Sequence, residues 1–172
     1  MIRDLYETFD PDEPPIFLSQ RCAALLLYWN TVRGSRALPS RTDIDPAALK
    51  PHLAHIMMLT AEYEPFRVCY RLVGTEIVRF ARFDFTGRYA DALDFQDDAG
   101  EDWTRFYRES AEARRPGRGV YHWTVDGLRR WIEFLICPLS SDDTMVDRFI
   151  AIEDYEHLNV IEIDTLPPVA PQ

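Results

Sequence analysis

The segment FRVCYRLVGTEIVRFARFDFTGR, from Phe66 to Arg88, changes its hydrophobic period at Gly74-Thr75. Before Gly74, apolar side chains from Phe66 to Leu72 occupy every second position, which is the period of a half-buried strand. After Gly74, apolar side chains share one side of a short helix, and the hydroxyl of Thr75 can cap its first amides. The chain must therefore fold into a sheet that passes directly into helices.

The last third of the chain carries the strongest strand pattern. The dipeptide Asp126-Gly127 separates the alternating segments 120–125 and 128–139. Asp-Gly favours a two-residue turn whose twist matches the flanking strands, so we expect a hairpin here. A turn at 140–144 and one more strand at 146–155 complete an antiparallel meander.

Counting back from the hairpin turn predicts which side chains share each face, because side chains alternate along a strand and pair across it. The more aromatic face, which we assign to the interior, carries Gly119, Tyr121, Trp123, Val125, Leu128, Arg130, Ile132 and Phe134. The opposite face, where the N-terminal helix or a second subunit should pack, carries His122, Thr124, Arg129, Trp131, Glu133 and Leu135.

Two helices are predicted from apolar stripes. Residues 16–33 form the first, and Gly34 is placed to end it. Its apolar surface is wider than one stripe, which indicates contact with a sheet on one side and with a second copy of the chain on the other. Residues 100–115 form the second helix, which Pro116-Gly117 ends. One face of that helix carries Trp103, Phe106, Tyr107, Ser110 and Ala111.

The region between these helices contains the first pair of strands. Residues 55–61 and the strand from Phe66 are separated by a turn at 62–65. Before them, the run LPSRTDIDPAALK, residues 38–50, predicts an extended connection and a short helix with Asp45-Pro46 at its start.

Composition bounds the class of protein. The 172 residues are 47% hydrophobic, enough to bury the core of one domain. A net charge of -10 argues against nucleic acid as a partner, since a phosphate-backbone binder needs a basic surface. Lys50 is the only lysine among 19 basic residues, and arginine favours fixed pairing with carboxylates.

The cysteines and the N-terminus indicate the compartment. Cys22, Cys69 and Cys137 are odd in number and lie in apolar stretches, so we expect buried reduced thiols and not disulfides. The acidic N-terminus lacks the pattern of a secretory signal, and no apolar run is long enough to span a membrane. We expect a cytoplasmic protein that does not contact membranes.

Four motifs together resemble a bacterial PAS-type sensory domain: YRLVGT at 70–75, TGR at 86–88, LPSRTDIDP at 38–46, and the closing three-strand meander. More narrowly, the chain is similar to single-domain proteobacterial PAS proteins with an N-terminal helix and an LPxRxDIDP motif. The resemblance covers residues 26–155. It implies an α+β fold in which a five-stranded antiparallel sheet, in the order 2-1-5-4-3, carries short helices and one long helix on one face, around a small cavity.

The resemblance divides the chain into four parts: an N-terminal arm at 1–15, a helix and connection at 16–54, a PAS-like core at 55–156, and a C-terminal tail at 157–172. It implies sensing or partner binding, and the fold alone does not name a ligand. The candidate pocket consists of Tyr70, Trp103, Phe106, Tyr107, Tyr121, Trp123, Arg130, Ile132 and Phe134.

Several alternatives stay open for these residues. The aromatic side chains can fill an ordinary core without room for a ligand. Arg130 can form a cation–π pair with Trp123, the favoured interpretation, or hold a ligand carboxylate. On the opposite face, His122 and Glu133 form either a surface pair or, less favoured, a switch that titrates near neutral pH.

Other site types find little support. His52 and His55 have a metal-like spacing, but the pattern changes from helix to strand between them and no cysteine or carboxylate accompanies them. No histidine on the long helix is placed to bind haem, and neither Cys69 nor Cys137 lies in a flavin-photosensor motif. We expect no metal or cofactor. A cluster of arginines at 114, 115 and 118 is a candidate anion contact, with an ion-paired surface as the default.

Three functions follow from these observations. The first is a sensory or regulatory module without an attached effector that binds a small organic ligand, a partner protein or both, and forms a homodimer through its N-terminal helix. The second is a ligand-free interaction scaffold. The third and weakest is a small-molecule enzyme, because no nucleophile with a base, paired carboxylates or phosphate loop is recognisable. A pocket holding a carboxylate of strongly shifted pKa would favour the enzyme again.

Overall fold

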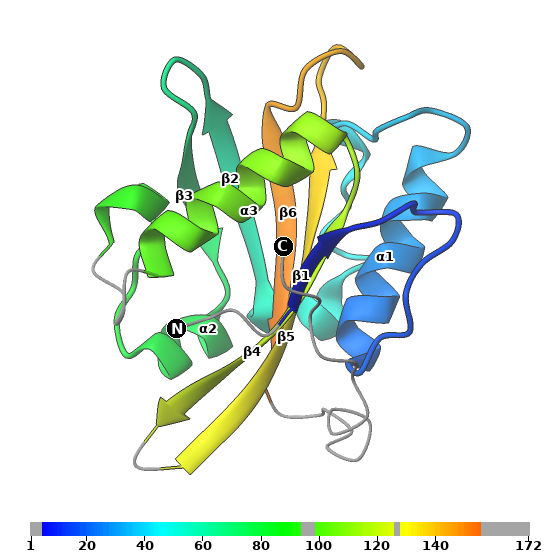
Figure 1. Ribbon diagram of the computed structural model, residues 1–172. Helices are drawn as coiled ribbons and strands as arrows, with labels where there is room; N and C mark the ends of the chain where they lie inside the picture. Colours follow the sequence, from blue (N-terminus) through cyan, green and yellow to red (C-terminus); the bar gives the residue numbers. More distant parts are fainter. Residues whose placement is uncertain (1–4, 94–98, 126–127, 156–172) are drawn as a thin grey trace.

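The computed structural model describes residues 5–93, 99–125 and 128–155, and only the backbone of residues 5, 99–102, 122–125 and 128–130. Its centre is a six-stranded antiparallel sheet in the order β1-β4-β5-β6-β2-β3 (Figure 1). The strands are β1 (Leu5–Thr8), β2 (Ile56–Glu62), β3 (Arg67–Val73), β4 (Gly117–Val125), β5 (Leu128–Leu139) and β6 (Arg148–Asp154).

The expected strand order is confirmed for the last five strands, and the sixth is an addition. In the order of the five predicted strands, β3-β2-β6-β5-β4 is the expected 2-1-5-4-3. Strand β1 extends this sheet by pairing Leu5 with Val120 and Thr8 with Gly117. This segment was predicted to be part of an N-terminal arm, since four residues are too few to show a period.

The helices lie on both faces of the sheet. Helix α3 (Ala99–Ala113) crosses one face (Figure 1). Helix α1 (Gln20–Arg33) packs on the opposite face, over β5 and β6. The other helical segments in the described part of the chain are α2 (Thr75–Ala81) and the 3-10 turns η1 (Arg41–Asp43), η2 (Lys50–His55) and η3 (Ala90–Ala92).

Helix α1 begins and ends at capping residues. The Ser19 hydroxyl accepts from the Cys22 amide, so the helix starts four residues later than the predicted Ile16. Gly34 ends it with a positive φ of 59°, as expected. The stripe of this helix is buried against the sheet, whereas Leu27 is 71% exposed on its outer side.

The LPSRTDIDP motif fastens α1 to the sheet. Ser40 and Asp43 cap each other's backbone around η1 in a reciprocal capping box. The hydroxyl of Tyr28, on α1, donates to the carbonyl of Asp43 at 3.3 Å and accepts from the amide of Asp45 at 2.7 Å. The carbonyl of Pro39, at the start of the motif, accepts from the amide of Ser140 just after β5 at 3.0 Å, so the motif joins α1 to the end of that strand.

Strand β3 contains an irregularity that the sequence pattern did not predict. Leu59 pairs with Tyr70 and Met58 pairs with Leu72, so Arg71 is an extra residue in β3. Tyr70, before the bulge, is 3% exposed, whereas Leu72, beyond it, is 47% exposed. The expectation that Phe66 to Leu72 share one face is therefore wrong beyond Tyr70.

The junction at Gly74-Thr75 is confirmed, but its cause differs from the prediction. Gly74, and not Thr75, is the N-cap of α2, and no side chain caps the helix. A Cβ atom at position 74 would collide with the carbonyl oxygen of Ala54. Glycine is therefore needed here because two backbone segments approach closely.

Replacing Gly74 with alanine should lower the free energy of unfolding by about 1–3 kcal/mol, the usual effect of overpacking. Thr75→Ala is the matched control, since Thr75 is exposed and makes no cap hydrogen bond, and it should cost much less. Urea unfolding measures both. An equal cost for the two variants would show that the close approach of the backbone at Gly74 does not constrain this junction.

Candidate functional site

A small pocket lies where α2 and α3 meet the inner face of the sheet. Its volume is about 30 Å³. That space holds one or two water molecules and is far below the several hundred Å³ of a drug-sized site. Its walls are Tyr70, Ile77, Phe80, Ala81, Phe85, Trp103, Tyr121 and Glu153.

Aromatic rings form most of the wall. The ring of Trp103, on α3, meets Phe134 and Tyr121 edge-on, with centroid distances of 4.7 and 5.6 Å. Tyr70 meets Phe85 edge-on at 4.7 Å. These geometries are those that aromatic pairs favour, so the wall is held in place by the rings themselves.

The pocket is nearly apolar except for one carboxylate. Glu153 lies on β6 opposite Phe134 of β5, and its side chain is 9% exposed. Among the described residues, none donates a hydrogen bond to this carboxylate or forms an ion pair with it. Burial raises the pKa of Glu153 from 4.5 to about 7.

Three buried tyrosines face the same region. Burial, followed by the charge of Glu153, raises the pKa of Tyr70 and of Tyr121 far above 10. Burial also raises the pKa of Tyr107, with Tyr70 and Glu153 adding to it. The Tyr107 hydroxyl makes no hydrogen bond of standard geometry to a described residue, although it lies near enough to Tyr70 for each to affect the other. All three phenols are neutral near pH 7.

The structure brings most of the predicted pocket residues together. Tyr70, Trp103 and Tyr121 line the space itself. The others that the structure describes are buried around it, as Tyr107 packs edge-on against Phe149 at 5.0 Å. These supporting residues are Phe106, Tyr107, Ile132 and Phe134.

The hairpin register is confirmed at every predicted pair, including Trp123 with Arg130. The side chains of Trp123, Arg130 and His122 lie outside the described part of the structure. The Asp126-Gly127 turn lies outside it entirely. The proposed cation–π pair therefore stays a prediction. The same holds for the tail at 157–172.

Glu153, the most informative pocket residue, was not predicted from the sequence. Its signal was present, because β6 alternates after the hairpin and Glu153 falls opposite Phe134, which was already assigned to the inner face. Phe80 and Phe85 were also missed, because they lie in short helical and loop segments without a reliable period.

The outer face of the sheet holds a buried ionic network under α1. Glu133 on β5 accepts from the Arg118 guanidinium at 2.6 Å and from the Ser19 amide at 2.6 Å. Its neighbour Asp154 accepts from the Ser19 hydroxyl at 2.7 Å and from Arg21 at 2.8 Å. Glu133 and Asp154 are fully buried, so these partners replace the water that both carboxylates lose.

This network corrects two sequence interpretations. Arg118 is 3% exposed and pairs with Glu133, so it is not a surface contact for an anion or an acidic partner. Glu133 is fully buried, so a pair with it would not lie at the surface, and because the His122 side chain lies outside the described part of the structure, contact between the two stays a prediction. Burial raises the pKa of Glu133, and the Arg118 charge opposes that shift.

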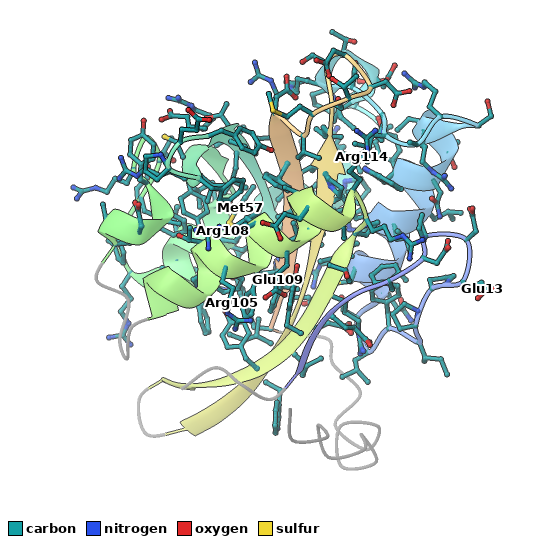
Figure 2. The ribbon with its side chains drawn as sticks, turned by 45° about the horizontal axis from the view of Figure 1, so that its top comes forward. Glu13, Met57, Arg105, Arg108, Glu109 and Arg114 are labelled. Carbon is teal, nitrogen blue, oxygen red and sulfur yellow. The ribbon has the colours of Figure 1, made fainter. Side chains whose placement is uncertain are left out.

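The other arginines of this region are paired at the surface, as the default interpretation held. Arg114 donates to the carbonyl of Asp143 at 2.7 Å, and Arg115 lies 3.6 Å from Asp10. Figure 2 shows Arg105, Arg108 and Glu109 along α3, with Arg114 just beyond its end. A shallow groove of about 340 Å³ adjoins these residues, and its walls include Tyr63, Phe66, Arg108, Ala111, Met145 and Val146.

The described residues also bear on the thiols, on metal binding and on membrane spans. All three cysteines are free, and their expected burial is confirmed. No group of three or more metal-ligating side chains occurs in residues 5–93, 99–125 and 128–155. Within the same ranges, each helix is too short or too polar to cross a membrane.

Comparison with known proteins identifies the architecture. The family model described as "PAS domain" matches residues 18–152. Among curated proteins, none matches the sequence of this chain.

The solved structures to which this chain is similar include three light-oxygen-voltage proteins. An RNA-binding light-oxygen-voltage receptor is 20% identical with a TM-score of 0.47, and the match covers 74% of this chain but only 38% of the receptor. A light-oxygen-voltage domain studied with a flavin analogue is 13% identical with a TM-score of 0.49, covering 69% of this chain and 87% of that domain. The Aureochrome1 light-oxygen-voltage domain is 10% identical with a TM-score of 0.45, covering 69% and 92% respectively.

Glu153 should make the stability of the protein depend on pH. Between pH 4.5 and about 7 the folded protein holds a proton on Glu153 that the unfolded chain has released, so the free energy of unfolding falls as pH rises through that interval. The full loss is about 3 kcal/mol at 1.36 kcal/mol per pH unit. Among the described residues, the phenols near Glu153 are those of Tyr70, Tyr107 and Tyr121, which stay neutral over this pH interval. His55 also lies close, with its Nδ1 atom 3.1 Å from the backbone carbonyl oxygen of Glu153.

Urea unfolding of wild-type protein and of Glu153→Gln from pH 4 to 8 measures this effect. The stability difference between the two should grow in favour of the variant as pH rises. Glu112→Gln, which removes an exposed acid from α3, is the matched control and should leave the wild-type profile unchanged. Parallel profiles for wild type and Glu153→Gln would refute the assignment.

Breaking the outer network from one side should be costly. Arg118→Met leaves Glu133 buried without its cation, and the expected loss is about 3–5 kcal/mol in the free energy of unfolding. The double variant Arg118→Met, Glu133→Leu removes both charges and should recover at least half of that loss. A loss of less than about 1 kcal/mol for the single variant would mean that the pair behaves as an exposed ion pair.

Proposed function

This chain belongs to the PAS-domain family, whose members are sensory domains, and we propose that it is a regulatory module that binds a small organic molecule in the pocket beneath α2 and α3. The observation that carries the proposal is Glu153. A buried carboxylate without a partner costs free energy, and a bound molecule that supplies a partner recovers that cost.

The size of the pocket determines how such a molecule binds. About 30 Å³ accommodates one small polar group, so the rest of the molecule extends outward past α2. Phe80 and Ala81 line that side of the pocket and are only half-buried, which makes them the rim.

The signal would pass to another chain through the outer face of the sheet. Glu153 points into the pocket, and the next residue, Asp154, holds α1 through Ser19 and Arg21. A change in the position of β6 on binding therefore reaches α1 within one residue. The exposed Leu27 on α1 supports a homodimer contact there, as the sequence analysis proposed.

The ligand-free scaffold is the second candidate, and the small pocket volume favours it. The enzyme is weaker. Glu153 supplies a carboxylate of raised pKa, but the described pocket walls contain no histidine, cysteine or second carboxylate to complete an acid–base pair or to activate a nucleophile. The net charge of -10 supports a partner other than nucleic acid.

Native mass spectrometry of the purified protein, followed by a thermal-shift screen of metabolites, tests the sensory proposal. A molecule bound at 100 times its Kd adds about 2.7 kcal/mol of stability, which raises the Tm by about 5–10 °C. Ala81→Leu, which narrows the rim, should abolish the response. Ala113→Leu, at the exposed end of α3, is the matched control and should preserve it.

Two results would favour the scaffold instead. One is a protein that carries no retained molecule and responds to none in the screen. The other is a thermal response that survives unchanged in Ala81→Leu, because the molecule would then bind outside this pocket.

A further inference from the structure

The described pocket is a carboxylate surrounded by aromatic rings. Glu153 supplies the one acidic group of its lining, and five of the eight lining residues are Tyr70, Phe80, Phe85, Trp103 and Tyr121. Aromatic faces attract cations through the ring quadrupole, and a buried carboxylate attracts them by charge. Both elements favour the same class of ligand, a positively charged group.

The small volume selects among organic cations. About 30 Å³ accepts one compact head group and excludes a trimethylammonium or a guanidinium group. A primary ammonium group is close to a water molecule in size and carries three hydrogen-bond donors. Glu153 can accept from it, and the hydroxyls of Tyr70 and Tyr121 lie in the field of the same carboxylate.

Resting on the proposed function, we infer that the pocket binds small primary amines, with the ammonium group paired to the Glu153 carboxylate and the apolar remainder leaving past Phe80 and Ala81. The inference reverses the polarity expected from the sequence, in which Arg130 was a candidate to hold a ligand carboxylate. Within the described pocket wall, the fixed charge is negative.

Binding by this route releases a proton. At pH 6 most Glu153 side chains are protonated, and an incoming ammonium ion requires the carboxylate, so the acid proton passes to solvent as the ion pair forms. An alkylamine is fully protonated at pH 6 and at pH 8. The apparent affinity should therefore rise about tenfold from pH 6 to pH 8, following the deprotonated fraction of Glu153.

The test uses n-butylamine as the probe and 1-butanol as its neutral analogue of similar shape. Titration of the full chain at pH 8, followed by the NMR resonance of the Trp103 indole N–H, reports binding at the pocket wall. We expect n-butylamine to bind at least tenfold more tightly than 1-butanol. Glu153→Gln should remove this preference and its pH dependence, whereas the charge-matched control Glu112→Gln should keep both.

Three outcomes would overturn the inference. If 1-butanol binds as tightly as n-butylamine, the ligand class is wrong while the pocket and the proposed function survive. If Glu153→Gln retains the preference for the amine, the carboxylate does not bind it. If neither probe shifts the Trp103 resonance in wild-type protein, amine binding fails, and the retained-molecule experiment decides the proposed function independently.

Discussion

The pairing of β5 with β6 is the constraint on which both faces of the structure depend. It sets Phe134 opposite Glu153 on the inner face and Glu133 opposite Asp154 on the outer face. Two consecutive acids of β6 therefore enter different environments. Glu153 lies among aromatic rings without a described partner, whereas Asp154 lies under α1 with a hydroxyl and a guanidinium group. The register must be correct at this point for either environment to form.

The different surroundings of Glu153 and Asp154 connect the stability of the protein to its proposed function. A carboxylate buried with good partners holds elements together, and removing one partner leaves the other exposed to the cost of desolvation. A carboxylate buried without partners weakens the fold when it ionises, and a bound cation can recover that free energy. The outer pair thus serves as the fixed support of α1, and the inner acid is the group whose state can change.

The sequence predicted those parts of the fold that repeat with a clear period or depend on a specific turn. The Asp126-Gly127 turn gave the hairpin register pair by pair, and the stripes of α1 and α3 predicted their buried faces. The Arg71 bulge was not predictable because an extra residue leaves no mark in the alternation before it. The Arg118–Glu133 pair was not predicted either. The sequence of a charged pair does not indicate whether a helix buries it or solvent surrounds it.

The limits of the family match bear on how the domain is handled as a fragment. The match spans residues 18–152, so a piece cut to those limits would end one residue before Glu153 and would lack Asp154 and β1. Such a piece would leave the row of amides and carbonyls along β4 open to pairing with other molecules. Its α1 would also lose the contacts of Ser19 and Arg21 with Asp154, and those of Asn30 and Arg33 with residues 11 and 12. Trimming to the family boundary would thus yield a fragment that is prone to aggregation, holds α1 less firmly and lacks Glu153, the acid of its proposed binding site.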